Sequence, residues 1–262
     1  MARLVWSHGF LVVGAALASA VLAGTLAPAA ASSEGSPALV RRALATFAGE
    51  HHGTLVAERH LAFSLHAGPF GRDVSNDIGV VINDGDFVRT KYYAQTSNGK
   101  IDDEATLRSA ERDANRELDG GRGFFKRPID PRYAEDYRFD PAECADCGAD
   151  TRTFSFTSKV RDEQHGDGTV TIDEATGHVL SLSYTLDKAP PHASSAHVVE
   201  TFGQALPKLW TCVRVAETFR GRLGPIGGSA SMHYTLDHFR RLVAKNGASA
   251  TLDEALASRA HS

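Results

Sequence analysis

The residues of this sequence best suited to chemistry are the paired cysteines of Cys144-Ala-Asp-Cys147. A Cys-x-x-Cys pair exchanges disulfides when a helix N-terminus stabilises its thiolate, but the acidic residues flanking this pair disfavour a second negative charge. We therefore predict that Cys144 and Cys147 form a short-loop disulfide that holds the surrounding segment, with Cys212 buried as a small apolar residue or competing for a partner. Two alternatives remain open, a redox-active pair and a structural zinc site that recruits Cys212 and histidines.

Histidine is the second candidate, because the chain contains 12 of them. His60 and His66 fall on the polar side of one predicted strand, beside Glu58 and Ser64. Six residues along a strand span about 20 Å, which is too far for one metal ion unless a neighbouring strand supplies ligands. The His-Glu-x-x-His signature of zinc proteases does not occur in the sequence. We therefore predict solvated polar residues here, with no metal site and no cofactor.

Signals for a nucleophile are weak. The sequence contains no Gly-x-Ser-x-Gly motif, and Gly227-Gly-Ser-Ala-Ser231 is typical of a turn before a strand rather than of a strand-to-helix elbow. Asp162, Glu163 and Asp167 could bind calcium weakly, but their spacing fits no known calcium loop, and acidic turns are commonly solvated. We predict no catalytic residue. A hydrolase whose His and Asp residues are brought together by folding remains an alternative.

A helix and a hairpin are predicted in the first part of the chain. Apolar residues at helical spacing after Ser36 predict an amphipathic helix over 37–50, with Ser36 as its N-cap. From Thr54 the period changes to two, which indicates a long half-buried strand. Asp84-Gly85 between two apolar runs predicts a type I′ turn, because both central residues of that turn need a positive φ.

The rest of the chain predicts a helix, a loop and a meander of strands. The acids at 102–104 and Gly120 bound a surface helix, and the Pro- and Cys-containing stretch 121–151 is predicted to be a loop that covers the sheet. Adjacent strands joined by short turns form antiparallel sheets, so we expect about eight to nine strands. Alternating apolar residues predict later strands at about 154–160, 170–172, 180–186, 196–203, 209–222 and 229–236.

Together these elements predict an α+β fold. We expect a strongly curved antiparallel β-sheet, a half-barrel-like meander, with helices packed on one face. Residues 32–250 are predicted to form a single domain with an inserted helix and loop segment at about 102–151. The predicted C-terminal tail, 251–262, forms a short helix or frays.

The first 31 residues are typical of a secretory signal peptide. A single charge, Arg3, precedes an Ala- and Gly-rich apolar run that ends in small residues at Ala31. We predict cleavage after Ala31 and an exported protein, periplasmic or extracellular; an uncleaved anchor is the alternative. The 262 residues carry a net charge of -4 and a mean hydropathy of -0.24, which excludes a polytopic membrane protein and a generic nucleic-acid-binding face.

Three segments between residues 165 and 241 share a strand and turn pattern. In Gly168-Thr-Val-Thr-Ile-Asp-Glu-Ala-Thr-Gly-His-Val-Leu180 a strand ends in Asp and a Thr-Gly turn leads into the next strand. Leu206-Pro-Lys-Leu-Trp210 precedes a long strand, and Tyr234-Thr-Leu-Asp-His-Phe-Arg240 ends the meander. This pattern resembles the periplasmic half-barrel of the lipoprotein carrier LolA and of RseB-type envelope-stress regulators. The resemblance implies a curved sheet whose concave side, plugged by helices, holds acyl chains or a lipidated partner.

Export, a meander with one apolar face and the lack of catalytic motifs predict a non-enzymatic protein. We expect it to bind an apolar small molecule, a lipid or a lipidated protein in the concavity of the sheet, through residues that the sequence does not identify. The alternative is a structural or interaction module of the envelope whose sheet is filled by its own side chains. A pocket lined by the apolar residues of 54–66 and 178–186 favours binding, and a filled interior favours the interaction module.

Overall fold

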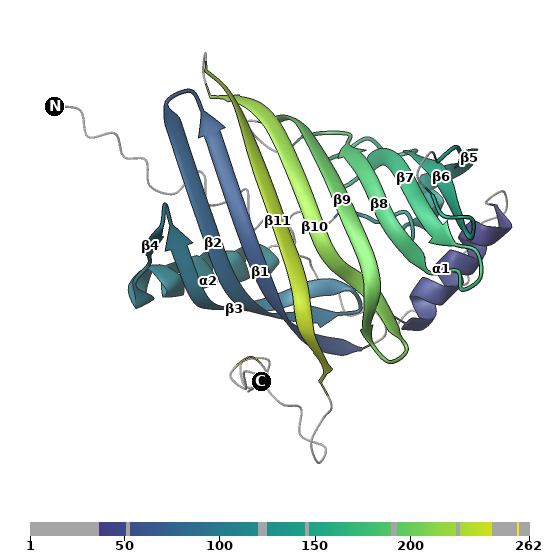
Figure 1. Ribbon diagram of the computed structural model, residues 1–262, viewed down its shortest axis with the longest axis horizontal. Helices are drawn as coiled ribbons and strands as arrows, with labels where there is room; N and C mark the ends of the chain where they lie inside the picture. The colour runs from purple at the N-terminus through teal and green to yellow at the C-terminus, as the bar shows by residue number, and fades with distance from the viewer. Residues whose placement is uncertain are drawn as a thin grey trace.

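The computed structural model describes residues 37–50, 53–119, 125–144, 147–189, 193–223, 226–242 and 256. These residues form one eleven-stranded antiparallel sheet with two α-helices and one short 3-10 helix, η2 (Figure 1). The elements in chain order are α1 (Ala38–Glu50), β1 (Thr54–Ala67), β2 (Phe70–Asn83), β3 (Asp86–Ser97), β4 (Lys100–Ile101), α2 (Glu104–Asp119), η2 (Ala134–Asp136), β5 (Tyr137–Ala142), β6 (Thr151–Ser158), β7 (Gly166–Asp173), β8 (Val179–Leu186), β9 (Ala193–Leu206), β10 (Leu209–Leu223) and β11 (Ile226–Arg241).

The strand order shows the path that the chain takes through the sheet. It runs β4-β3-β2-β1-β11-β10-β9-β8-β7-β6-β5, so every neighbouring pair except β1 and β11 is consecutive in sequence. The two edge strands, β4 and β5, follow one another along the chain. The segment that links them must therefore cross from one edge of the sheet to the other. We call residues 102–136 the crossover segment, and its buried residues Phe125 and Ile129 belong to the core, as expected for a stretch that covers the sheet.

The two faces of the sheet differ in composition, as the alternation in β1 predicted. Leu55, Ala57 and Leu61 are buried in the main core, whereas His60 lies on the opposite side. We call the side that carries these buried residues the inner face and the other side the outer face. Arg59 follows the same alternation and lies on the inner face, 7% exposed, because a period of two places it between Ala57 and Leu61.

The predicted hairpin turn is confirmed. Asp84 and Gly85 join β2 to β3 with φ angles of 47° and 89°, the positive values that a type I′ turn requires. The backbone N–H of Gly53 donates to Asp84 Oδ1 over 2.9 Å, which holds the turn against the start of β1.

The structure has more strands than the eight to nine predicted. The difference arises largely in the predicted loop 121–151, where β5 forms at the sheet edge and Phe139 pairs with Phe156. Pro141 indicated a loop, but an edge strand tolerates proline because one side of its backbone needs no partner within the sheet. The two-residue strand β4 was also missed, since two residues carry no periodicity.

Helix α1 confirms the prediction over 37–50. Its buried residues Val40, Ala43, Leu44 and Phe47 recur at helical spacing and join the core of the inner face. The predicted N-cap, Ser36, lies outside the described residues.

The end of α1 is held to the sheet by Glu50. One of its carboxylate oxygens accepts a 3.0 Å hydrogen bond from the backbone N–H of Trp210, and the other lies 2.9 Å from Nε2 of His178. The His178 and Trp210 rings stack at a centroid distance of 4.7 Å, and Trp210 Nε1 donates to the Val179 carbonyl. These contacts hold the last turn of α1, and with it Phe47, over the starts of β8 and β10.

Helix α2 lies at the other end of the sheet, along the free edge of β3 (Figure 1). There the Asn115 side chain makes the two hydrogen bonds that a neighbouring strand would make with Thr90. Its Oδ1 accepts from the Thr90 N–H and its Nδ2 donates to the Thr90 carbonyl, each over 2.9 Å. Glu111 accepts from the Tyr92 N–H over 3.1 Å. The prediction of helices packed on one face therefore describes α1, whereas α2 covers an edge, because its buried stripe includes the polar Asn115.

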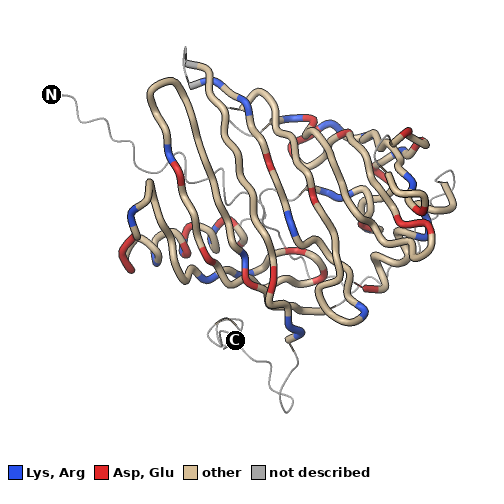
Figure 2. The backbone as a smooth tube through the Cα atoms, in the orientation of Figure 1, with Lys and Arg blue, Asp and Glu red and all other residues tan. Residues whose placement is uncertain are grey.

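Charges of both signs are interspersed along the chain (Figure 2), so no element presents a long run of one sign. Within the described residues no helix is both long enough and apolar enough to span a membrane. The predicted signal peptide over 1–31 lies outside the described residues, as does the predicted tail apart from Leu256, which packs on Val56 and Val81.

Candidate ligand-binding cleft

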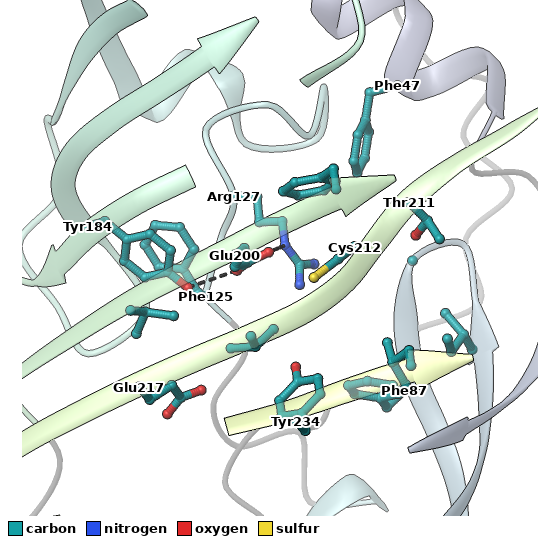
Figure 3. Close-up of a pocket in the computed structure, with 16 residues that line it drawn as sticks. Phe47, Phe87, Phe125, Arg127, Tyr184, Glu200, Thr211, Cys212, Glu217 and Tyr234 are labelled. Atoms are coloured by element: carbon teal, nitrogen blue, oxygen red, sulfur yellow. Dashed lines mark hydrogen bonds and ion pairs between the residues drawn. The ribbon is translucent and has the colours of Figure 1, made fainter. Parts of the chain in front are cut away.

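A cleft opens on the inner face between strands β8 to β11, the β2–β3 turn, α1 and the crossover segment (Figure 3). Its empty space is about 680 Å³ when its open mouth is included, and its closed part has room for only a few water molecules. The described residues that line it are Phe47, Ile82, Gly85, Phe87, Phe125, Arg127, Tyr184, Val198, Glu200, Phe202, Thr211, Cys212, Val215, Glu217, Tyr234 and Leu236.

Aromatic rings form much of the wall. The Phe125 ring of the crossover segment stacks on Tyr184 of β8, with ring centroids 3.7 Å apart and an interplanar angle of 8°. Phe87 and Tyr234 meet edge to face with centroids 6.5 Å apart. Tyr184 and Tyr234 reach the cleft because each occupies an inward position of its strand, and Phe125 reaches it because the crossover segment passes over the sheet.

Three polar groups are bonded to one another inside this apolar wall (Figure 3). Arg127 Nε donates to Glu200 Oε2 over 2.7 Å, and the Tyr184 hydroxyl donates to Glu200 Oε1 over 2.9 Å. Burial lowers the pKa of the Arg127 guanidinium, but Glu200, with smaller contributions from Cys212 and Tyr184, more than offsets it and the net shift is upward. Arg127 and Glu200 therefore form an ion pair in which the Glu200 carboxylate is buried, the Arg127 side chain is 21% exposed, and both oxygens of Glu200 are satisfied.

The Glu217 carboxyl group, unlike that of Glu200, is not fully hydrogen-bonded. It is 5% exposed, and its Oε1 has no hydrogen-bond partner within the described part of the chain. Burial raises the pKa of the Glu217 carboxyl to about 8, the nearby Glu200 carboxylate adds to this rise, and the Arg59 cation opposes it. At neutral pH Glu217 is therefore largely the neutral acid.

Arg59 closes the cleft on the side of β1. Its guanidinium carbon lies 5.6 Å from the ring centroids of both Phe87 and Tyr234, a distance suited to cation–π attraction. Its buried Nε has no hydrogen-bond partner within the described residues. Among the described residues, β1 contributes none of the lining. Of the two ranges whose apolar residues would favour binding if they lined a pocket, 54–66 therefore contributes none and 178–186 contributes Tyr184.

Cys212 lies in the cleft as a free, buried thiol. It donates to the Arg214 carbonyl with an S–O distance of 3.4 Å, and burial raises the pKa of the Cys212 thiol. A thiol that resists ionisation is a poor nucleophile and a poor redox partner. Cys144 and Cys147 are joined to each other by a disulfide, with Cα atoms 5.4 Å apart, so Cys212 does not compete for either.

The predicted histidines lie on the outer face and do not meet in one site. His60 Nδ1 is 2.7 Å from Asp77 Oδ1, and His60 Nε2 is 3.2 Å from Asp237 Oδ1. The hydrogen bond to Asp77 raises the pKa of the His60 imidazole; burial opposes the shift and Asp237 adds to it. Both contacts are hydrogen bonds only when both ring nitrogens carry protons, so this bridge links β2, β1 and β11 through an imidazolium.

The second group on that face, Ser64 with His66, does not form a hydrolytic site. The Ser64 hydroxyl lies 3.1 Å from His66 Nε2, but it donates its single proton to Asp73 Oδ1, so the carboxylate contacts the serine rather than orienting the histidine. Among the described residues no three His, Cys, Asp or Glu side chains are placed to hold a metal ion.

The acids considered for calcium serve local structure. Asp162 accepts from the Gln164 N–H and lies 2.6 Å from Nδ1 of the buried His165. Asp167 accepts from the Ser158 N–H over 2.8 Å and from Arg161 over 2.9 Å. Asp162 Oδ1 and both carboxylate oxygens of Asp167 are therefore engaged within the protein.

The polar residues of the cleft were not identified from the sequence, although two of them leave a signal there. Glu200 stands between Val198 and Phe202, and Glu217 between Val215 and Phe219, each at an inward position of an otherwise apolar alternation. A carboxylate in such a position is costly to bury and indicates either a partner or a ligand. Arg127 leaves no such signal, because the crossover segment has no periodicity.

No protein-family model and no curated protein match the chain. Similar solved structures include an outer membrane lipoprotein-sorting protein domain from Vibrio parahaemolyticus, with 13% identity, a TM-score of 0.39, and 79% of this chain and 94% of that chain covered. A LolA superfamily protein from Nitrosomonas europaea matches with 9% identity, a TM-score of 0.32 and coverages of 79% and 94%. The Pseudomonas aeruginosa MucA/MucB complex matches with 9% identity, a TM-score of 0.21 and coverages of 79% and 98%. The predicted resemblance is thus confirmed as a likeness to these structures.

Proposed function

We propose that this protein is exported and binds an apolar ligand, a lipid or the lipid chain of a modified protein in the inner-face cleft, without catalysing a reaction. In this proposal the sheet curves around the cleft as a half-barrel, with α1 and the crossover segment as its cover. The periplasm or the extracellular space is the compartment that the leader over 1–31 indicates.

One observation carries the proposal. The cleft is walled by aromatic and aliphatic side chains, and its few polar groups, Arg127, Glu200 and Glu217, converge on its interior. An apolar concavity with a small number of placed polar groups is the usual form of a site for small apolar molecules. The described part of the cleft contains neither a metal-ligand set nor an activated nucleophile.

The cleft must widen to accept a ligand of any length, because its closed part holds only a few waters. Helix α1 is suited to this movement, since Glu50 joins it to the sheet by side-chain contacts, whereas the strands share continuous backbone hydrogen bonds. The crossover segment also bonds through its backbone, with the Lys126 N–H donating to the Gln164 carbonyl over 2.8 Å. Apolar area gained by the ligand, about 25 cal/mol for each Å², offsets the cost of moving the cover.

Binding can be tested with N-phenylnaphthylamine, a neutral apolar probe whose fluorescence rises when it leaves water. We expect the wild type to bind it and Val198→Phe to weaken binding by about tenfold or more, because Val198 lines the cleft and the larger ring fills it. The matched control is Val199→Phe, the same change at the next residue on the outer face, which should leave binding unchanged.

Native mass spectrometry of the protein from an exporting host is the second test, with an extractable lipid expected in the complex. A wild-type protein that carries no lipid and does not bind the probe would refute the proposal. Circular dichroism on both variants separates a filled cleft from a failure to fold.

A second candidate function rests on the narrowness of the cleft. If the inner face is closed by its own side chains, the protein is a structural or interaction module of the envelope. Equal and weak probe binding by wild type, Val198→Phe and Val199→Phe would favour this candidate.

A further inference from the structure

The orphan oxygen of Glu217 points to the kind of ligand that the cleft accepts. Its cross-strand neighbours on the inner face are Val198 of β9 and Met232 of β11. Neither side chain has a donor for this oxygen, and the Met232 sulfur is only a weak acceptor. Arg127 and Tyr184 donate to Glu200 instead, and Arg59, whose own Nε has no described partner, donates no hydrogen bond to this oxygen. Burying an oxygen without a hydrogen-bond partner destabilises the folded protein, so an unpartnered oxygen in a cleft indicates an external partner.

The charges around Glu217 restrict what that partner can be. Glu200 from β9 and Arg59 from β1 are within electrostatic range of Glu217, and Glu200 is paired with Arg127 of the crossover segment. Tyr184 and Tyr234 face the same space as neutral phenols, because burial raises the pKa of each. With Glu217 neutral, the cations of Arg59 and Arg127 and the anion of Glu200 leave one net positive charge, which disfavours an ammonium group. A carboxylate would lose its hydration beside the Glu200 carboxylate in a poorly hydrated cleft.

A neutral carboxyl group also has two hydrogen-bonding needs. Its carbonyl oxygen accepts, and its hydroxyl donates. A hydroxyl or amide group on the ligand can meet both needs at once, whereas an ammonium group offers no acceptor and an ionised carboxylate offers no donor.

We propose that Glu217 is the polar anchor of the cleft, and that the ligand is an apolar molecule whose polar end is an uncharged hydroxyl or amide. This inference rests on the proposed function, because it assumes that the cleft receives an apolar ligand. It adds to the proposed function the chemical class of the ligand's polar end, and it names Glu217 as the residue that recognises that end.

Four straight-chain compounds of equal length test this inference: lauryl alcohol, lauramide, laurate and laurylamine, each displacing N-phenylnaphthylamine at neutral pH. We expect the alcohol and the amide to bind about tenfold more tightly than the two charged compounds, the effect of one net hydrogen bond. Glu217→Gln should keep this preference, because glutamine also offers one acceptor and a donor. Glu217→Leu should bring all four affinities within about threefold of one another.

The matched control is Thr218→Leu, the adjacent residue on the same strand, which is exposed on the outer face. It should leave the order of the four compounds unchanged. Binding that ignores the head group, tightest binding of laurylamine or laurate, or an unaltered order in Glu217→Leu would each overturn the inference while the proposed function stands. Failure of the probe and of all four compounds to bind the wild type would instead refute the proposed function.

Discussion

Glu200 and Glu217 occupy inward positions on neighbouring strands, yet their surroundings differ at the level of single atoms. Glu200 has two donors, Arg127 and Tyr184, whereas Glu217 has an oxygen without one. The difference arises because Arg127 of the crossover segment bonds to Glu200 and not to Glu217. The unpaired acid is therefore the more sensitive of the two to pH and to ligand.

The raised pKa of Glu217 predicts a pH dependence of stability. The carboxyl group titrates near 4.5 when unfolded and at about 8 when folded, so between these values the folded protein holds a proton that the unfolded chain has lost. Its contribution to the free energy of unfolding therefore falls as pH rises from about 4.5 to about 8, by at most ~1.4 kcal/mol per pH unit. Urea unfolding of the wild type and of Glu217→Gln across this range should show the wild type losing stability relative to the variant as pH rises.

In that comparison every other titrating group is common to both proteins, so its effect cancels. Parallel curves for wild type and Glu217→Gln would show that Glu217 does not hold a proton in the folded state. Glu217→Leu should be at least as stable as the wild type above pH 8, because it removes a buried charge without a partner.

His60 provides a second prediction at the residue scale, on the outer face. Its folded pKa is raised above 6.5, mainly by Asp77, so its stabilising contribution is present at low pH and is lost as pH rises through the folded pKa. Histidine side-chain NMR should record this elevated pKa in the wild type, and Asp77→Asn should lower it. The same pKa in both proteins would contradict the bridge; His233, which faces the same side, serves as the internal reference.

At the scale of elements, α2 covers the free edge of β3. A strand edge exposes unpaired N–H and C=O groups, and the side chains of Asn115 and Glu111 satisfy part of that edge. A helix therefore completes this side of the sheet where the two-residue strand β4 is too short to do so.

Asn115→Ala should lower the free energy of unfolding by about 2 kcal/mol, because it leaves the N–H and the carbonyl of Thr90 buried without partners. Denaturant unfolding measures the change, and light scattering should detect more self-association through the opened edge. Arg112→Ala, an exposed change on the same helix, should cost no more than about 0.5 kcal/mol. Equal losses in the two variants would contradict the edge-capping role of Asn115.

Comparison of elements shows why the sequence predicted some of them and missed others. The alternation of Leu180, Leu182 and Tyr184 predicted a strand correctly, because Leu182 and Tyr184 are buried on the inner face of the sheet. The edge strand β5 was missed because Pro141 normally ends a strand, and its edge position is a property of the whole sheet. The cleft was missed for the same reason, since Phe125 and Arg127 acquire their places only through the crossover of the chain.

At the scale of the whole molecule, the disulfide is a local feature. It closes a loop between residues only three apart in sequence, beside the edge strand β5. Because the entropy lost by the unfolded chain grows with loop length, we expect its removal in a Cys144→Ser, Cys147→Ser double variant to cost no more than about 2 kcal/mol.

Thiol alkylation followed by intact mass measurement checks the state of all three cysteines. The native protein should take up no label, because Cys212 is buried. Unfolding without a reductant should allow labelling of Cys212 alone, and reduction should add Cys144 and Cys147. Labelling of both Cys144 and Cys147 in the native protein would remove the disulfide.

The pairing of β1 with β11 has a kinetic consequence. It joins Leu55 to Arg241, while the other strand pairs connect consecutive strands, so we expect it to be the late and slow step of folding. Phe87 lies on the β1–β3 side of this pairing and Glu217 on the β10–β11 side. The cleft is therefore complete only when β1 has paired with β11. A ligand of the cleft should therefore leave the refolding rate unchanged and slow unfolding as its concentration rises.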